Sequence, residues 1–267
     1  MSIRRCVTSE RLMSISEHAS LFFDLGAQKG PTVISIVGAG GKTSTLFWLA
    51  HLFQLSGRRV FITTTTHMFL PDQDWPILFC RDPAGLPRHA LMQPFITCFQ
   101  SWKASLGKVR GFAPGAIDAL ARRSECDVVL VEADGARGKP LKAPDEHEPC
   151  IPESSCCVIA VMGGHLLGKS VGADRVHRWP QFAEMTGLTE GAPLSLEALV
   201  RLVQHPQGAF KNAPPASRRV WFLNRFSQSE NAIDERELIQ PLSEGDVQAI
   251  WLGNAQETPA IARRFVR

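Results

Sequence analysis

The sequence lacks a long apolar segment. Its longest apolar stretch, residues 46–53, is interrupted by His51, and the first five residues, Met-Ser-Ile-Arg-Arg, are not followed by an apolar region. A helix that spans a bilayer needs about 20 mostly apolar residues, and a secretory signal needs an apolar region of about 7–15. The sequence therefore predicts neither a membrane span nor a signal peptide.

The cysteines also lack a recognisable pattern. Seven are present, an odd number, with no C-x-x-C pair and no cysteine and histidine cluster at zinc spacing. This usage is typical of a protein in the reducing cytoplasm. Cys156 and Cys157 open an apolar run over residues 156–162, so we expect small core residues of a strand, with a redox role as the alternative.

No run of one charge occurs. The net charge is +3, and the positive residues are scattered rather than gathered into a stripe, so nucleic acid is not expected as a partner. With 267 residues and 44% hydrophobic content, the chain can bury a sizeable core. We expect one nucleotide-binding α/β domain over residues 1–267 with insertions, and a possible subdomain edge near residues 207–217.

A glycine-rich loop is the most informative motif that is present. An apolar strand is predicted at residues 32–37 and an amphipathic helix at 43–54, with Gly57 placed for a left-handed C-cap. Glycines allow consecutive backbone N–H groups to surround an anion, a lysine adds charge, and a hydroxyl can bind Mg²⁺. The predicted phosphate-binding residues are Gly38, Ala39, Gly40, Gly41, Lys42, Thr43 and Ser44.

This loop is shorter than the common G-x-x-x-x-G-K-[ST] form, because Ile36 stands five positions before Gly41. A glycine-rich turn with an incidental lysine is the alternative interpretation. The strand before the loop and the helix after it favour nucleotide phosphate binding, since this is the context that the motif requires.

Strands alternate with helices along most of the chain, which predicts an α/β fold with a mainly parallel sheet, helices on both faces, and a P-loop NTPase-like core. Further strands are expected at residues 59–63, 76–80, 127–132, 156–162, 219–223 and 247–252, and further helices at 114–123, 174–185, 195–204 and 234–242. The stretch 95–111 has no clear pattern.

Two acidic residues end the strand predicted at 127–132. Glu132 and Asp134 are two positions apart, so both face the same crevice at the carboxyl edge of the sheet if the strand conformation persists through Ala133. With Thr43, either carboxylate is a candidate ligand of Mg²⁺. The alternative is a turn at Asp134 and a salt-bridged strand end at Glu132.

Cationic and hydroxyl groups are expected at the same edge. Arg137 and Lys139 follow the acidic pair and suit an anionic substrate or the γ-phosphate, although a plain surface loop is equally compatible with them. Thr65 and Thr66 end the second predicted strand and are candidate ligands of nucleotide or metal. His67 is a candidate general base, while threonine runs are also simply good strand formers.

Asn224 follows another predicted strand and is a candidate contact to the base. Its surroundings, Asn224-Arg225-Phe226-Ser227, lack the aspartate of the guanine-reading Asn-Lys-x-Asp motif. Guanine selectivity is therefore not predicted; ATP is preferred, and GTP is not excluded.

Together these motifs resemble the YqeC family. The resemblance rests on residues 38–43, 63–67, 131–144, 163–169, 176–178 and 222–224, of which Glu-Ala-Asp-Gly-Ala is the most specific, whereas the short glycine loop is shared with Mur-type ligases. It implies a bacterial accessory protein of selenium-dependent molybdenum hydroxylases that helps to make or insert a labile selenium cofactor. The implied partners are a nucleotide and either such a hydroxylase or a selenium-containing small molecule.

Three functions remain open from the sequence. The first is a Mg²⁺-dependent NTPase that drives maturation of a partner enzyme, with Lys42, Glu132, Asp134, Arg137, Lys139 and His67 as catalytic candidates. The second is a Mur-like ligase or kinase that uses ATP on a small anionic substrate. The third is a nucleotide-gated protein that binds a cofactor or partner with little turnover.

Overall fold

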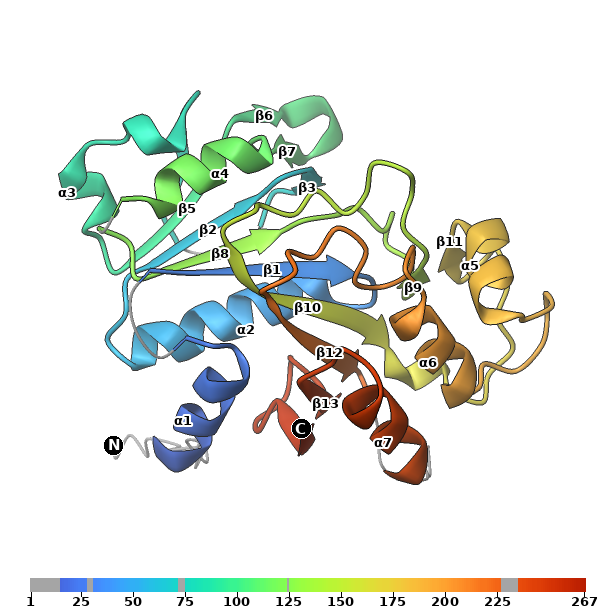
Figure 1. The fold of residues 1–267 in the computed structure, drawn as a ribbon. Helices are drawn as coiled ribbons and strands as arrows, with labels where there is room; N and C mark the ends of the chain where they lie inside the picture. The colour runs from blue at the N-terminus through green and yellow to red at the C-terminus, as the bar shows by residue number, and fades with distance from the viewer. Residues whose placement is uncertain (1–14, 28–30, 72–74, 124, 227–234) are drawn as a thin grey trace, which may run out of the picture.

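The computed structural model describes residues 15–27, 31–71, 75–123, 125–226 and 235–267. Within these residues the chain forms a nine-stranded sheet of order β14-β13-β12-β10-β1-β8-β2-β5-β4, a three-stranded sheet and a two-stranded sheet (Figure 1). Neighbouring strands of the large sheet run parallel, except that the edge strand β14 is antiparallel to β13. The predicted α/β class with a mainly parallel sheet is confirmed.

The bounds of the elements follow the chain. The large sheet contains β1 (Thr32–Gly38), β2 (Val60–Thr64), β4 (Ile77–Phe79), β5 (Phe95–Phe99), β8 (Val128–Glu132), β10 (Ser155–Gly163), β12 (Arg218–Asn224), β13 (Ala249–Gly253) and β14 (Ile261–Val266). The small sheets contain β3 (His67–Phe69), β6 (Ser101–Lys103) and β7 (Lys108–Arg110), and β9 (Leu141–Lys142) with β11 (Val176–His177). The α-helices are α1 (Ile15–Asp24), α2 (Lys42–Leu55), α3 (Arg88–Leu91), α4 (Pro114–Ala121), α5 (Trp179–Thr186), α6 (Leu196–Gln204) and α7 (Glu235–Ser243), and the 3₁₀ helices are η1 (Pro83–Gly85), η2 (Ala104–Leu106) and η3 (Gly164–Leu166).

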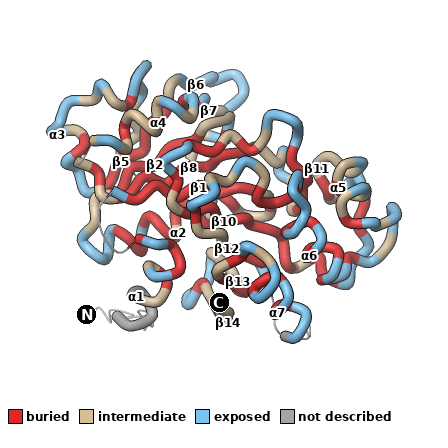
Figure 2. Tube along the Cα trace, viewed as in Figure 1, coloured by how far each residue is buried: buried red, intermediate tan, exposed pale blue. Residues whose placement is uncertain are grey.

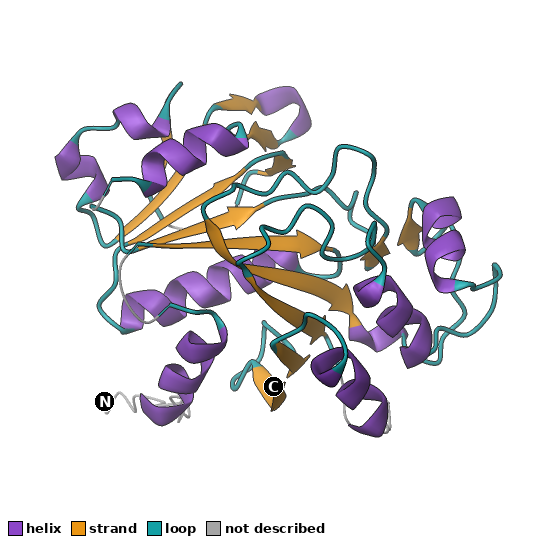
Figure 3. Ribbon diagram, viewed as in Figure 1, coloured by secondary structure: helices purple, strands orange, loops and turns teal. Residues whose placement is uncertain are grey.

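Helices cover both faces of the large sheet, because its central strands are apolar on both sides (Figures 2 and 3). In β1, Val33 and Val37 point into the core formed with α4, α5, α6 and α7. Ile34 and Ile36 point into the opposite core, formed with α1 and α2. The alternation within one strand thus feeds two separate hydrophobic layers.

Helix α2 forms as expected, and Gly57 follows its end in the left-handed region with φ 78°. No helix among the described residues is both long and apolar enough to cross a membrane. Cys157 is buried in β10, and Cys156 beside it packs partly buried against the same core.

One sequence expectation needs correction, and one stretch that showed no clear pattern forms strands. The helix expected at 174–185 begins only at Trp179, because residues 176–177 form β11 and pair with β9, and Arg178 takes a left-handed conformation before the helix starts. The unclear stretch 95–111 contains β5, which enters the large sheet between β2 and β4, and then β6 and β7 of the three-stranded sheet.

A buried carboxylate ties the N-terminal helix to the C-terminal edge of the sheet. Asp24 is 0% exposed and accepts hydrogen bonds from Trp251 Nε1 at 2.9 Å and from the Arg264 guanidinium. Its backbone oxygen accepts a further bond from Arg218 at 2.7 Å. Elements from the two ends of the chain therefore depend on one charged side chain.

We expect Asp24→Asn to lower the free energy of unfolding by about 3 kcal/mol, because it leaves the Arg264 guanidinium without its counter-charge in a largely buried place. The matched control is Asp246→Asn, whose exposed pair with Arg219 should contribute less than about 1 kcal/mol. Denaturant unfolding of both variants tests this. Equal losses in the two would contradict a central role for Asp24.

Candidate functional site

The loop of residues 38–43, hereafter the glycine loop, joins β1 to α2 at the carboxyl edge of the sheet. Gly41 has φ 122°, and a Cβ on it would lie 2.1 Å from Asn224 Nδ2. A Cβ on Gly40 would lie 2.6 Å from the backbone nitrogen of Gly163. Because the N-cap residue of α2, Gly41, has no side chain to cap the helix, the first N–H groups of the helix stay available to an anion.

Lys42 lies beneath this loop between two carboxylates. Its side chain is only 6% exposed, and its ammonium donates to the Gly38 carbonyl at 2.8 Å. The ammonium lies 3.4 Å from Asp134 Oδ1 and 3.9 Å from Glu132 Oε1. The two acidic residues do face the same side of the strand end, as the spacing of two predicts, and Lys42 holds both.

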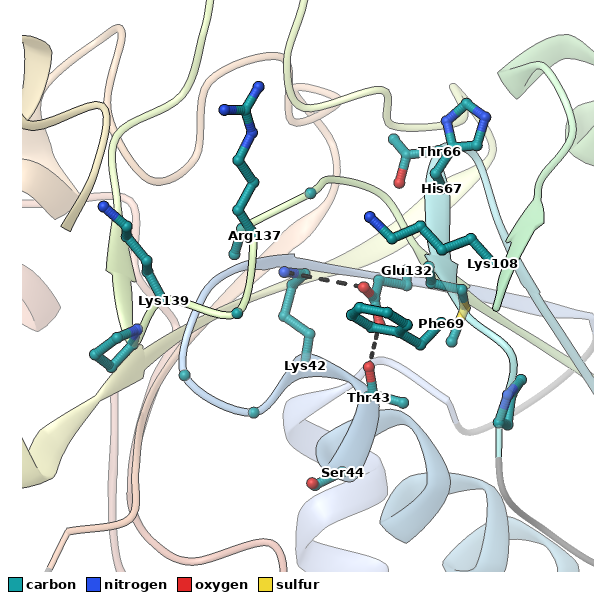
Figure 4. A pocket seen from close by; sticks show the side chains of 18 of the residues that line it. Lys42, Thr43, Ser44, Thr66, His67, Phe69, Lys108, Glu132, Arg137 and Lys139 are labelled. Carbon is teal, nitrogen blue, oxygen red and sulfur yellow. Dashed lines mark hydrogen bonds and ion pairs between the residues drawn. The ribbon is translucent and has the colours of Figure 1, made fainter. Parts of the chain in front are cut away.

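Glu132 also contacts the first turn of α2. The Thr43 hydroxyl donates to Glu132 Oε2 at 2.8 Å (Figure 4). Burial raises the pKa of the Glu132 carboxyl, and the nearby Lys42 charge and the Thr43 hydrogen bond only partly oppose this. A hydroxyl and a carboxylate thus meet directly beside the glycine loop.

Asp134 is bound differently. Its Oδ2 accepts from the Gly38 backbone N–H at 3.0 Å and lies 2.9 Å from the ammonium of buried Lys142. Its Oδ1 is buried, has no hydrogen-bond partner among the described residues, and lies within ion-pair distance of Lys42. Asp134 therefore sits between two buried lysines and fixes the start of the glycine loop.

The ion pairs continue away from the loop. Lys142 Nζ lies 2.7 Å from Glu148 Oε2, and the same oxygen accepts from Arg178 Nη1 at 2.7 Å. Burial raises the pKa of Glu148, but hydrogen bonds from Arg178 and Lys142 outweigh it, so the pKa lies below its usual range. Arg178 precedes α5, so this chain of charges links the glycine loop to a separate part of the fold.

A cavity of about 700 Å³ opens above the glycine loop. Its charged lining includes Lys42, Lys108, Arg137, Lys139 and Arg225 against two acids, Glu132 and Glu148. Figure 4 shows Arg137 and Lys139 on one side of Lys42, and Thr66, His67, Phe69 and Lys108 on the other. The excess of cations suits an anionic ligand.

Ten of the expected site residues line this cavity: Gly40, Gly41, Lys42, Thr43, Ser44, Thr66, His67, Glu132, Arg137 and Lys139. Their convergence from four separate segments follows from the parallel sheet, whose strand ends share one edge. Lys139 is turned aside, since its ammonium donates to the carbonyls of Ala173 and Val176. Arg137 is exposed and takes a left-handed conformation with φ 50°.

The other expected residues lie outside the lining. Gly38 and Ala39 form the base of the loop, and the Ala39 N–H donates to Val161 at 2.8 Å. The Thr65 hydroxyl donates to the Cys150 carbonyl at 2.7 Å. Asp134 lies beneath the loop, as described above. Their bonds serve the framework of the site.

Asn224 braces the site instead of opening toward it. It is 1% exposed; its Nδ2 donates to the Gly40 carbonyl at 2.8 Å, and its Oδ1 accepts from the Ala255 N–H at 2.9 Å. The amide holds the glycine loop against the segment that follows β13.

A second cavity, of about 450 Å³, shares Thr43, Ser44 and Pro71 with the first. It runs along α2 past Trp48 and His51, and its opposite wall is residues 255–258. Among the described residues, no lysine or arginine lines it and Glu257 is its one acidic residue, so it suits the uncharged part of a ligand better than the phosphates.

Sequence reasoning missed Lys108 and Phe69 as cavity residues and Glu148 as the partner of Lys142. The local signal for Lys108 was the preceding Gly107, which lies between two short strands, and Phe69 had no comparable signal. Glu148 gave no signal, because its role depends on the path of loop 143–150 back toward the sheet.

Residues 34–180 match the family described as YqeC protein, and they contain the glycine loop, Glu132 and Asp134. The chain is 69% identical over 255 residues to a protein of Escherichia coli (strain K12) named "Uncharacterized protein YqeC". The aligned region covers 96% of this chain and 100% of that protein.

The two carboxylates should respond differently to loss of charge. Asp134→Asn leaves Lys42 and Lys142 close together without the charge between them, so we expect a loss of about 3–5 kcal/mol in unfolding free energy. Glu132→Gln should cost less than about 1 kcal/mol or stabilise at pH 7, because a raised pKa means that ionised Glu132 is unfavourable in the fold.

The pH dependence has a defined sign. Because the pKa of Glu132 is raised in the folded state, its contribution to the stability of the fold is fully present below its pKa in the unfolded chain, about 4.3. This contribution is lost as the pH rises through its pKa in the folded state. The stability advantage of Glu132→Gln should therefore grow from pH 4 toward pH 8 in denaturant titrations. Equal destabilisation by both variants at pH 7 would contradict the distinction.

Proposed function

The chain belongs to the YqeC family, and from the geometry beside its glycine loop we propose that it is a Mg²⁺-dependent nucleotide-binding protein that hydrolyses or transfers the terminal phosphate, with ATP preferred. The observation that carries the proposal is the convergence of Lys42 and Thr43 on Glu132 beside a loop whose three glycines have no room for a Cβ. This combination suits a phosphate chain and its metal ion.

The groups present fit Mg²⁺ bound together with a nucleotide. No cluster of three or more His, Cys, Asp or Glu among the described residues suits a metal ion on its own. Mg²⁺ commonly takes one or two protein oxygens and completes its shell with water and phosphate oxygens. The Thr43 hydroxyl and the Glu132 carboxylate would supply such oxygens, and the ion would neutralise charge on the phosphates.

The positions of the other cavity residues suggest how each would contact the nucleotide. Lys42 would exchange its contacts with the two carboxylates for phosphate oxygens. Arg137 and His67 line the same cavity and would face the terminal phosphate or an acceptor. The nucleoside would lie in the second cavity along α2, whose described lining contains neither lysine nor arginine.

One observation favours transfer to an acceptor over hydrolysis alone. The larger cavity extends beyond the glycine loop to His67, Phe69 and Lys108, which leaves a cationic wall for a second substrate. A Mur-like ligase or kinase reaction on a small anionic molecule is therefore our second candidate. It predicts turnover that is slow until the acceptor is added.

The proposed biological role follows from the family resemblance of the motifs: an accessory factor in maturation of a selenium-dependent molybdenum hydroxylase. A nucleotide-gated binding protein would use the same site with little turnover. The ion pairs from Asp134 to Arg178 offer that version a physical route from the glycine loop to α5.

We expect Thr43→Ala and Glu132→Gln each to lower Mg²⁺-dependent phosphate release about 10–100-fold and to raise the Mg²⁺ concentration needed for half-maximal rate. The matched control is Glu153→Gln, an exposed acid just before β10 at the opposite edge of the sheet, which should leave the rate unchanged.

Phosphate release is measured with ATP and with GTP over a Mg²⁺ titration. Mg²⁺-dependent binding without release would favour the gated version. The assignment of the metal site fails if both site variants behave as the control does.

A further inference from the structure

The three-stranded sheet carries an unusual face. Because side chains alternate along each strand, His67 and Phe69 of β3, Ser101 and Lys103 of β6, and Lys108 and Arg110 of β7 lie on one face. The opposite face carries Met68 and Val109, which are buried against Phe99. We call the first set the cationic face; it is polar except for Phe69.

Positive charges face one another across its strands. Lys103 lies directly opposite Lys108, and Arg110 lies between His67 and Ser101. Like charges opposite each other destabilise a sheet. Among the described residues, no acidic side chain forms an ion pair with Lys103, Lys108 or Arg110, so within this part of the chain the repulsion has no acidic counter-charge.

Lys108 is nonetheless held in place. Its ammonium lies 5.0 Å from the centre of the Phe69 ring, an arrangement that orients the cation and leaves its charge available. Lys108 is partly buried, whereas Phe69 is 66% exposed. An exposed aromatic ring and an oriented cation together form a surface for a ligand rather than a core contact.

The cationic face is continuous with the site at the glycine loop. A cavity of about 300 Å³ on this face is lined by His67, Ser101, Lys103, Leu106, Lys108 and Arg110. His67 and Lys108 also line the larger cavity that contains Lys42 and Glu132. A small molecule held by Lys103 and Arg110 would therefore reach toward the position expected for the terminal phosphate.

We infer that the cationic face binds a second substrate: a small molecule with at least two negative groups, phosphate or carboxylate, one of which is directed toward the glycine loop. The direction of the ligand toward the glycine loop depends on the proposed function. The anion site itself is inferred from the charges of the three-stranded sheet alone. The small volume and three cations suit a compact anion better than a nucleic acid strand.

The test is a calorimetric titration with inorganic pyrophosphate as the probe. The full chain is first saturated with Mg²⁺ and a non-hydrolysable ATP analogue. We expect the loaded wild type to bind pyrophosphate and Lys103→Ala/Lys108→Ala to bind it about tenfold more weakly or worse. Arg122→Ala removes an exposed cation after α4 at the opposite edge and should change the affinity less than twofold.

Lys108→Glu separates binding from stability. It places an acid opposite Lys103, so the thermal midpoint should be no lower than that of the wild type while pyrophosphate binding is lost. A purely structural role for Lys108 predicts a lower midpoint instead.

The two proposals fail separately. If the analogue does not bind, the proposed function fails. The anion site is then tested without nucleotide, in the Lys42→Ala variant. Pyrophosphate binding to this variant that is lost when Lys103→Ala and Lys108→Ala are added still supports the anion site. The inference is overturned if the wild type does not bind pyrophosphate, if the double variant binds it equally well, or if a short single-stranded oligonucleotide binds in its place.

Discussion

The arrangement depends on one buried cation. Lys42 lies between Glu132 and Asp134 beneath a loop that cannot accommodate side chains at its glycines. Burying three charges together is favourable only if each keeps its partners, so the loop, the end of β8 and the start of α2 must hold their relative positions. The sheet order supplies this, because β8 pairs directly with β1 and brings Glu132 opposite Ile36, just before the loop. In the function proposed above, the ammonium would exchange its contacts with the carboxylates for contacts with phosphate oxygens.

The two carboxylates divide the work. Asp134 binds the Gly38 N–H and both Lys42 and Lys142, which makes it a positioning residue for the loop. Glu132 contacts the Thr43 hydroxyl and lines the cavity, and burial raises the pKa of its carboxyl although the Lys42 ammonium lies 3.9 Å from its Oε1. The two cavities also differ in charge. Lysines and arginines line the cavity above the glycine loop, whereas none of the described residues along the cavity beside α2 is a lysine or an arginine.

Local patterns predicted much of this site. The apolar strand before the glycine loop, the helix after it and the spacing of two between Glu132 and Asp134 each depend on a few neighbouring residues, and the structure agrees with them. Features that depend on pairing between segments far apart in the sequence could not be predicted from local patterns. Residues 95–99 enter the sheet only because β2 offers an open edge, and α5 starts late because residues 176–177 pair with β9. Asn224 was expected to contact a base, but its amide is bonded to Gly40 and Ala255, two positions that only the folded sheet brings near. The place of Lys108 in the cavity was not predicted either, because it also depends on segments that only the fold brings together.

Calorimetric titration of the wild type and Lys42→Ala with ATP and with GTP, each in the presence of Mg²⁺, tests the central claim most directly. The account predicts that the wild type binds ATP and that the substitution weakens binding by about 1.5–3 kcal/mol, since it removes a charged contact to phosphate. Binding of neither nucleotide by a folded wild type, or equal affinity in the variant, would contradict a phosphate-binding role for the loop.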